Sequence, residues 1–135
     1  MPTSATGHFV AADWKESRIS PEQDTPGLSH ATVSNTFSGA IQAVGTVCAY
    51  EIVYLAEMTG TFTGMEVISG SLDGHKGSFA VEQHGVFEAD GTLRCTFEVV
   101  PGSGSGELAG LTGTGSFTTR NGDTSVPYTF DYDLT

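Results

Sequence analysis

TFTGMEVISGSLDGHKGSFAVEQHG, residues 61–85, predicts a β-hairpin that turns at Asp73-Gly74. An Asp-Gly pair between alternating segments favours a type I′ turn, whose central residues take positive φ and whose twist matches that of the strands. Every second residue then shares a face, and we expect the face with more bulky apolar residues to point inward. A three-residue loop with a bulge would exchange the two faces. The expected inner face holds Phe62, Gly64, Glu66, Ile68, Leu72, Phe79, Val81 and Gln83.

Glu66 is the main candidate for a catalytic group, because it is a carboxylate on the face that we expect to be buried. Burial raises the pKa of a carboxyl group by desolvation, and a raised pKa suits a general acid or base near neutral pH. The alternative is a structural network in which Glu66 is hydrogen-bonded to Tyr54, Gln83 or the backbone. If the two faces are exchanged, His84 turns inward instead.

The composition describes one acidic domain. With 135 residues and 38% hydrophobic content, the chain suits a single core. We assign residues 7–135 to one barrel domain and residues 1–6, which are small and polar, to a disordered N-terminus. The net charge of -11 argues against nucleic acid and anionic membranes as partners, because both are bound through basic side chains. It leaves a soluble acidic surface or a cationic ligand as the alternatives.

The sequence also predicts the compartment. No signal-peptide pattern opens the chain, and no run approaches the roughly 18 apolar residues of a membrane span. These two observations predict a cytoplasmic protein with no membrane partner.

Two cysteines, Cys48 and Cys95, lie far apart in alternating apolar segments, with no CxxC spacing. We predict that both are buried free thiols. Neither a metalloprotease motif nor a nucleophile elbow is present, so we predict no metal site and no cofactor. The histidines are scattered along the chain at His8, His30, His75 and His84.

The N-terminal part predicts one strand and one long loop. Residues 8–15, HFVAADWK, alternate loosely, which places Val10, Ala12 and Trp14 on one face. Trp14 would serve as a core anchor or as one wall of a ligand pocket. Residues 16–29 contain two prolines, a glycine and several turn formers, so we predict a surface loop there.

The next two segments also predict strands. Residues 30–39 alternate, with Asn35 as a polar residue on the inner face. Residues 40–57 have the apolar content of a helix, but Gly45 interrupts them and their β-branched and aromatic residues prefer a pleated surface. The inner face of this second strand holds Cys48, Tyr50, Ile52 and Tyr54.

The C-terminal part predicts further strands around a glycine-rich stretch. Residues 92–101 alternate, and Asn121-Gly122 predicts another hairpin turn. Residues 104–109, GSGELA, match the dinucleotide-binding fingerprint formally, but no helix pattern follows them. We therefore expect these glycines to serve sharp bends. The predicted inner faces are Leu93, Cys95, Phe97 and Val99, and then Tyr128, Phe130, Tyr132 and Leu134.

Counted together, these segments give seven or eight strands with no helix of substantial length. Such a chain forms a closed antiparallel barrel or a sandwich. The 18 glycines favour the barrel, because strong coiling of a small closed sheet needs glycine bends. We predict an all-β protein with a closed antiparallel β-barrel of about eight strands.

The motifs that carry a family resemblance run along nearly the whole chain. They include EVISGSLDG at 66–74, GSF at 77–79, HG at 84–85 and VPGSGSGELAGL at 100–111. In this order they resemble a family of small bacterial domains of unknown function that is similar in fold to allene oxide cyclase. The resemblance implies an eight-stranded antiparallel barrel with a central cavity. Barrels of this kind include cyclases and isomerases of reactive apolar substrates, but fold alone does not transfer an activity.

These observations predict a barrel that binds an apolar or amphipathic small molecule in its central cavity. One hypothesis is a cofactor-independent cyclase or isomerase with Glu66 and Tyr54 as catalytic residues. The second is a non-catalytic binding protein, and the third is a structural or oligomerising module with a filled interior. The sequence leaves open whether the chain is a monomer or a homodimer. The residues that we expect to bind the ligand are Trp14, Asn35, Tyr50, Phe79, Gln83, Phe97 and Tyr128.

Overall fold

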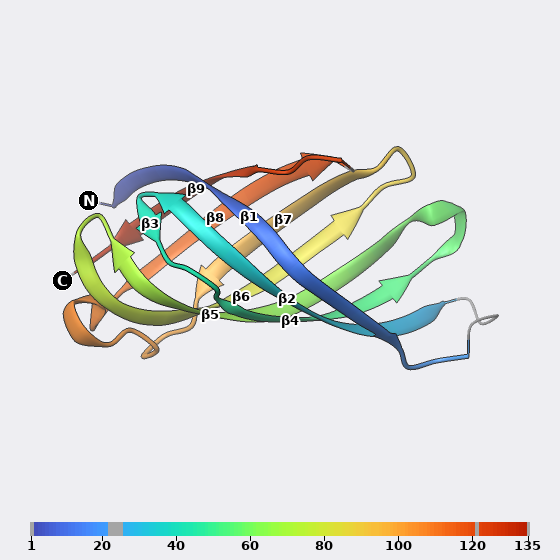
Figure 1. Cartoon of the computed structure of the whole chain (residues 1–135), viewed down its shortest axis with the longest axis horizontal. Coiled ribbons are helices and arrows are strands. Elements are labelled where there is room, and N and C mark those ends of the chain that lie inside the picture. The colour runs from blue at the N-terminus through green and yellow to red at the C-terminus, as the bar shows by residue number, and fades with distance from the viewer. Residues whose placement is uncertain (1, 22–25, 121, 135) are drawn as a thin grey trace.

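The chain forms a closed antiparallel β-barrel in a computed structural model that describes residues 2–21, 26–120 and 122–134 (Figure 1). The described residues contain no α-helix, and the two short 3₁₀ turns are η1 (Ala56–Met58) and η2 (Gly106–Leu108). The predicted fold class is therefore confirmed. The strands are β1 (Thr3–Arg18), β2 (Gly27–Gly39), β3 (Ile41–Gln42), β4 (Val47–Tyr54), β5 (Gly60–Leu72), β6 (His75–Phe87), β7 (Thr92–Val99), β8 (Thr112–Arg120) and β9 (Val126–Asp133).

Eight long strands close the barrel in the order β5-β4-β2-β1-β9-β8-β7-β6, and the pairing of β5 with β6 completes the circle. All of these pairings are antiparallel. The two-residue strand β3 pairs with the end of β5, where Ile41 lies opposite Leu72. Closure removes the open sheet edges that would otherwise be free to pair with other chains.

The hairpin of β5 and β6 has the predicted turn and the predicted faces. Leu72 pairs with His75, so the loop is the two residues Asp73 and Gly74. Their φ angles are 47° and 85°, as a type I′ turn requires. Glu66 is 2% exposed and lies on the inner face, whereas His84 is exposed on the outer face. The alternative in which His84 turns inward is therefore wrong.

The N-terminal strand is longer at both ends than the sequence indicates. We expected order to begin at Gly7 and a loop at 16–29, but β1 pairs with β9 from Thr3 and with β2 as far as Arg18. Every residue from Val10 to Arg18 is exposed, so no alternation of burial marks residues 16–18 as the continuation of the predicted strand. Residues 1 and 22–25 of the predicted tail and loop lie outside the described residues.

A bulge in β1 places Trp14 on the opposite face from Val10 and Ala12, with which the alternation had grouped it. The pairing of β1 with β2 shifts between Ala12 and Lys15, and Asp13 has a φ of 60°. Before the bulge, Phe9 is buried and Val10 is 49% exposed, which is the reverse of the predicted facing. The bulge inserts an extra residue and thereby brings Trp14 to the inner side.

The glycine-rich stretch after β7 closes one end of the barrel and forms no nucleotide-binding unit. Ser105 N donates to Ser78 O at 2.9 Å, and Lys76 N donates to Glu107 Oε1 at 2.7 Å, so the stretch is bound along β6. Leu108 is 0% exposed in the core. Figure 1 shows this loop at the same end as the β5–β6 turn. The turn predicted at Asn121-Gly122 lies partly outside the described residues, because Asn121 is not described.

The interior has two parts that differ in packing. The larger apolar cluster fills the end that the glycine-rich stretch closes, and it includes Ile41, Leu72, Phe79, Leu108, Leu111 and Phe130. A smaller cluster lies toward the other end and consists of Ala31, Ile52, Phe62 and Cys95, with Tyr50, Tyr54, Phe87, Leu93 and Phe117 packed against it. The buried polar side chains are Ser29, Asn35, Thr46, Glu66, Gln83 and Thr92.

Several inward aromatic side chains lie directly over a glycine of the neighbouring strand. A Cβ atom on any of these glycines would lie between 2.1 and 2.4 Å from the aromatic side chain of the paired residue. The glycines therefore provide the space in which these rings lean sideways across the sheet. The pairs are Gly7 with Tyr128, Gly60 with Phe87, Gly64 with Tyr50, Gly85 with Phe62 and Gly115 with Phe97.

We expect Gly85→Ala to lower the free energy of unfolding by roughly 1–3 kcal/mol, the usual cost of overpacking a core. The new Cβ would lie 2.1 Å from Phe62 Cζ and 2.8 Å from the Arg94 carbonyl oxygen. Urea denaturation of the single variant and of Gly85→Ala in a Phe62→Leu background measures the effect. The cost should shrink in the Phe62→Leu background, and equal costs in both backgrounds would contradict the proposed contact.

Candidate functional site

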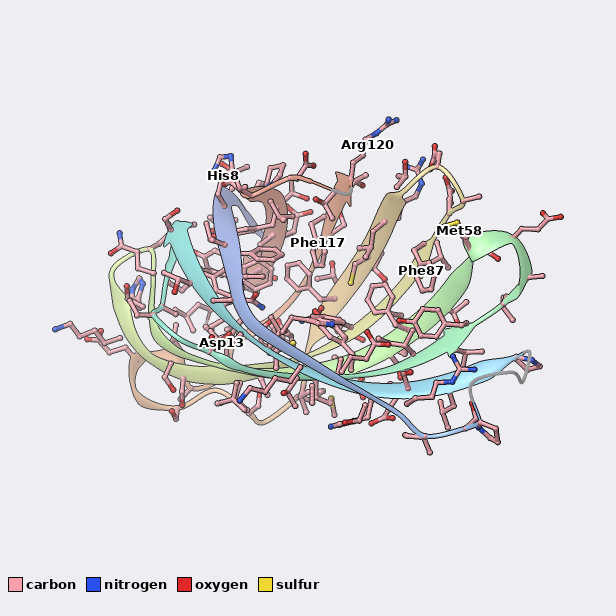
Figure 2. The ribbon with its side chains drawn as sticks, turned by 45° about the vertical axis from the view of Figure 1, so that its right-hand side comes forward. His8, Asp13, Met58, Phe87, Phe117 and Arg120 are labelled. Atoms are coloured by element: carbon pink, nitrogen blue, oxygen red, sulfur yellow. The ribbon has the colours of Figure 1, made fainter. Side chains whose placement is uncertain are left out.

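A cavity of about 650 Å³ opens at the end of the barrel opposite the glycine-rich stretch. Its rim includes Met58 from the β4–β5 connection and Glu88, Ala89 and Gly91 from the β6–β7 connection. Figure 2 shows Met58 and Phe87 at this end, with Phe117 deeper in the interior. The other lining residues are Phe9, Ala11, Trp14, Val33, Asn35, Tyr50, Ile52, Tyr54, Phe62, Phe87, Leu93, Phe117, Thr119 and Val126.

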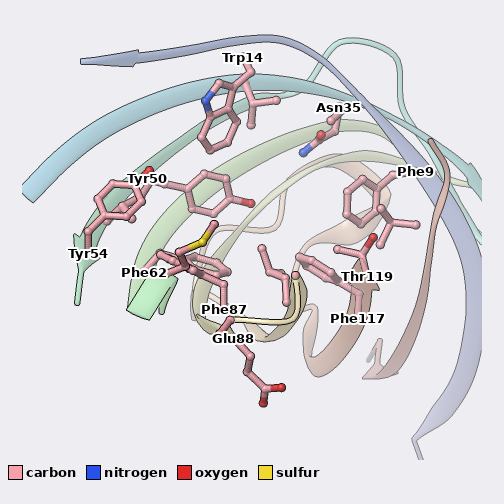
Figure 3. A pocket seen from close by; sticks show the side chains of 18 residues that line it. Phe9, Trp14, Asn35, Tyr50, Tyr54, Phe62, Phe87, Glu88, Phe117 and Thr119 are labelled. Carbon is pink, nitrogen blue, oxygen red and sulfur yellow. The ribbon is translucent and has the colours of Figure 1, made fainter. Parts of the chain in front are cut away.

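Aromatic side chains form most of the cavity wall (Figure 3). The rings of Trp14 and Tyr50 have centroids 6.2 Å apart, and the Tyr50 ring meets Phe62 edge to face at 5.3 Å. On the rim, Tyr54 and Phe87 form a similar pair at 5.5 Å. Edge-to-face contacts of this kind hold aromatic rings in defined orientations. The wall is therefore apolar and fixed in shape by contacts within the barrel.

A buried polar network centred on Glu66 lies behind this wall. Gln83 Nε2 donates to Glu66 Oε1 at 2.7 Å, and Oε2 accepts from Asn35 Nδ2 at 2.9 Å and from Thr46 Oγ1 at 2.6 Å. The Tyr50 hydroxyl donates to Gln83 Oε1 at 2.7 Å. Both carboxylate oxygens are thus hydrogen-bonded, as a buried carboxylate requires. Asn35 and Tyr50 belong both to this network and to the cavity lining.

Burial raises the pKa of Glu66, and the hydrogen bonds from Thr46, Asn35 and Gln83 oppose that rise. Among the described residues, no basic side chain forms an ion pair with Glu66. Burial also raises the pKa of the Tyr50 hydroxyl well above its ordinary value. The network is therefore a set of neutral donors around one carboxyl group, without a neutralising cation.

The two cysteines flank the same network. Cys95 Sγ donates to Gln83 Oε1 at 3.7 Å, and Gln83 Nε2 lies 4.0 Å from Cys48 Sγ. Both are free and buried, which confirms the prediction. Desolvation is the main cause that raises the pKa of each thiol to about 12. Such thiols are weak nucleophiles at neutral pH, because the thiolate is the reactive form.

The structure brings some of the predicted site residues to the cavity and places others elsewhere. Trp14, Asn35, Tyr50 and Tyr54 line the cavity. Tyr54 donates to Glu16 on the rim, so the expected contact between Tyr54 and Glu66 is not formed. Glu66, Gln83, Phe97 and Tyr128 line a separate internal void of about 20 Å³, and Phe79 stacks on Phe130 in the packed half.

Several wall residues were not among the predicted site residues. Phe62 lies on the predicted inner face, so the sequence pattern indicated that it points into the barrel, although it was not among the predicted ligand-binding residues. Phe117 and Thr119 lie in β8, where alternating glycines hide the pattern of apolar residues. Met58 is the last residue of η1, and no sequence pattern marks it as part of a cavity rim. The cavity thus depends on which strands meet, which alternation alone does not give.

Within the described residues, no group of three or more His, Cys, Asp or Glu side chains is placed to hold a metal ion. The described part of the chain also contains no helix with the length and apolar character of a membrane span.

Comparison with known proteins shows where the chain belongs. A family model described as "Protein of unknown function (DUF3224)" matches residues 5–132. The chain is similar to a crystal structure of a protein with unknown function from that family, from Shewanella oneidensis MR-1. The TM-score is 0.78 at 27% identity, and the match covers 100% of this chain and 99% of the other. No curated protein matches. The predicted resemblance to a bacterial family of unknown function is confirmed, whereas the likeness to allene oxide cyclase stays a prediction.

We expect Cys48 and Cys95 to react slowly with Ellman's reagent in the native protein and rapidly in guanidinium chloride. Their side chains are buried, and with a pKa of about 12 only about one thiol in 10⁴ is ionised at pH 8. Absorbance of the released thionitrobenzoate gives both rates. Rapid labelling of both cysteines without denaturant would contradict their placement.

We expect the stability of the protein to fall as pH rises above 4.5, the ordinary pKa of Glu66, toward its raised pKa in the folded state. In this window the folded protein holds a proton that the unfolded chain has released, so unfolding becomes easier by up to roughly 1.4 kcal/mol per pH unit. Glu66→Gln should lack this decline. The measurement is urea denaturation at several pH values.

Glu82→Gln is the matched control, because Glu82 is an exposed glutamate of the same hairpin. It should keep the decline, since Glu66 is still present. An identical pH dependence in the wild type and in Glu66→Gln would show that Glu66 titrates at its ordinary value.

Proposed function

The chain belongs to the DUF3224 family, and we propose that it binds a small molecule with an apolar body in the open end of its barrel. The observation that carries the proposal is the cavity of about 650 Å³ with its aromatic wall. Ligand cavities typically span about 300–1,000 Å³ and combine apolar walls with a few polar groups. The size and the lining of this cavity are both of that kind.

The contrast between the two ends of the barrel supports this proposal over a purely structural role. The closed end contains fully buried Leu72, Leu108 and Phe130, so the chain has the side chains to fill a barrel interior. At the open end, Tyr50, Phe62 and Phe87 lean over glycines and leave the centre free. A barrel that served only as a scaffold would gain stability from larger side chains here.

The rim favours a neutral or cationic ligand. Glu88 lines the rim, where its carboxylate pairs with Arg94 at 3.5 Å, and Glu16 accepts hydrogen bonds from Trp14 Nε1 and the Tyr54 hydroxyl, which also line the cavity. The whole chain carries a net charge of -11. A carboxylate group would therefore meet repulsion during its approach to the cavity.

Binding is better supported than catalysis by Glu66. Glu66 does not line the cavity, and Asn35 and Tyr50 stand between its carboxyl group and the open space. A cofactor-independent isomerase or cyclase would require a substrate that reaches past these side chains, or a reaction that depends on confinement alone. The general acid or base role of Glu66 stays a prediction.

We expect the fluorescence of N-phenylnaphthylamine to increase when the protein is added, because the probe would move from water into an apolar site. Ala11→Phe places a ring in the cavity and should weaken binding at least about tenfold, which is a loss of about 1.4 kcal/mol. Fluorescence titration gives the dissociation constants.

Ala12→Phe is the matched control, because Ala12 is an exposed neighbour on β1 that does not line the cavity. It should bind the probe as the wild type does. Equal weakening in both variants, or no fluorescence increase with the wild type, would contradict binding in this cavity.

A further inference from the structure

One oxygen atom at the cavity lacks the partner that its burial demands. Asn35 is 3% exposed and lines the cavity, and its Oδ1 has no hydrogen-bond partner among the described residues. A buried carbonyl without a partner is destabilising, because it has lost its hydrogen bonds to water and gained none in return. Figure 3 shows Asn35 between Trp14 and Phe9, with its side chain directed toward the cavity. A hydrogen-bond donor on a bound molecule would supply the missing partner.

The other polar side chains of the lining already have partners. The Tyr50 hydroxyl donates to Gln83, the Tyr54 hydroxyl donates to Glu16, and Thr119 Oγ1 donates to Asp123 Oδ2 at 3.1 Å. Asn35 Oδ1 is therefore the candidate acceptor for a hydrogen bond from a bound molecule.

Glu66 determines which atom of the Asn35 side-chain amide lacks a hydrogen-bond partner. Both Glu66 oxygens accept hydrogen bonds in this network, and Oε2 holds Asn35 Nδ2 at 2.9 Å, so Asn35 Oδ1 points away from Glu66. Thr46 and Gln83 fill the remaining acceptor positions of the carboxylate and keep it in place. Glu66 thus acts as a positioning residue that leaves the acceptor of the Asn35 amide, and not its donor, without a partner beside the cavity.

We propose that the ligand is a neutral alcohol or phenol with an apolar ring body, and that its hydroxyl donates a hydrogen bond to Asn35 Oδ1. This rests on the proposed binding function and specifies its ligand class. A carboxylic acid does not fit, because it is ionised at neutral pH, offers no donor to Oδ1 and is repelled by the net charge of -11 that the chain carries. An aromatic body suits the ring-lined wall through offset and edge-to-face contacts.

The test compares β-naphthol with its methyl ether, which has the same ring system but no donor. The wild-type protein should bind β-naphthol roughly tenfold more tightly, since the methyl ether leaves the buried Asn35 carbonyl without a donor. Titration of the naphthalene fluorescence gives both constants. This comparison needs no variant, so it does not depend on whether a substituted chain folds.

Three variants locate the hydrogen bond. Asn35→Leu should bring the two affinities together, while Thr119→Val, which removes another hydroxyl from the lining, should keep the preference. Glu66→Gln should reduce the preference, because a glutamine can present either a donor or an acceptor and no longer fixes the Asn35 amide. A Glu66 that served stability alone would leave the ratio of the two affinities unchanged.

The outcomes separate this inference from the proposed function. If neither naphthalene compound binds and N-phenylnaphthylamine also fails, the cavity is not a binding site and both proposals fall. If both compounds bind equally to the wild type, the binding function stands and the role of Asn35 is wrong. Loss of the preference in Thr119→Val would assign the hydrogen bond to Thr119 instead.

Discussion

The pairing of inward aromatic residues with glycines on the neighbouring strand is the constraint on which the rest of the structure depends. Tyr50, Phe62 and Phe87 each lie opposite a glycine, where even a methyl group would collide with the ring. Because these rings lean along the sheet, they cover the backbone and leave the axis of the barrel open. The wall of a cavity and the coiling of the sheet thus come from the same residues.

Glu66 lies between the packed half and the open half of the barrel, where it organises a buried hydrogen-bond network. A carboxyl group at 2% exposure is costly unless its oxygens are hydrogen-bonded, and Asn35, Thr46 and Gln83 come from three separate parts of the chain to meet it. An apolar residue would fill this position with less risk. The carboxylate instead orients the side-chain amides of Asn35 and Gln83, because each donates a hydrogen bond to it.

The sequence predicted the parts of this structure that depend on local alternation and turn chemistry. The hairpin at Asp73-Gly74, the inner faces of the strands and the burial of Glu66 follow from a period of two and a turn that needs positive φ. The far end of β1, residues 16–18, was missed because it is exposed on both faces. The predicted shared face of Val10, Ala12 and Trp14 was wrong because a bulge shifts the register between Ala12 and Lys15. A central cavity was expected from the family resemblance, but its volume and its full lining could not be predicted, because they depend on rotamers and on contacts between distant strands.

Backbone strain gives a last, independent argument about the open end. Four non-glycine residues among those described have positive φ, and Asp73 is explained by its turn. The positive φ of Asp13 belongs to the bulge in β1, which leaves Glu57 and Met58, and Met58 lines the cavity. Strain of this kind costs about 1–3 kcal/mol per residue and persists where the surrounding structure enforces it. At Glu57 and Met58 the surrounding structure thus fixes the backbone of the β4–β5 connection at the point where Met58 lines the cavity.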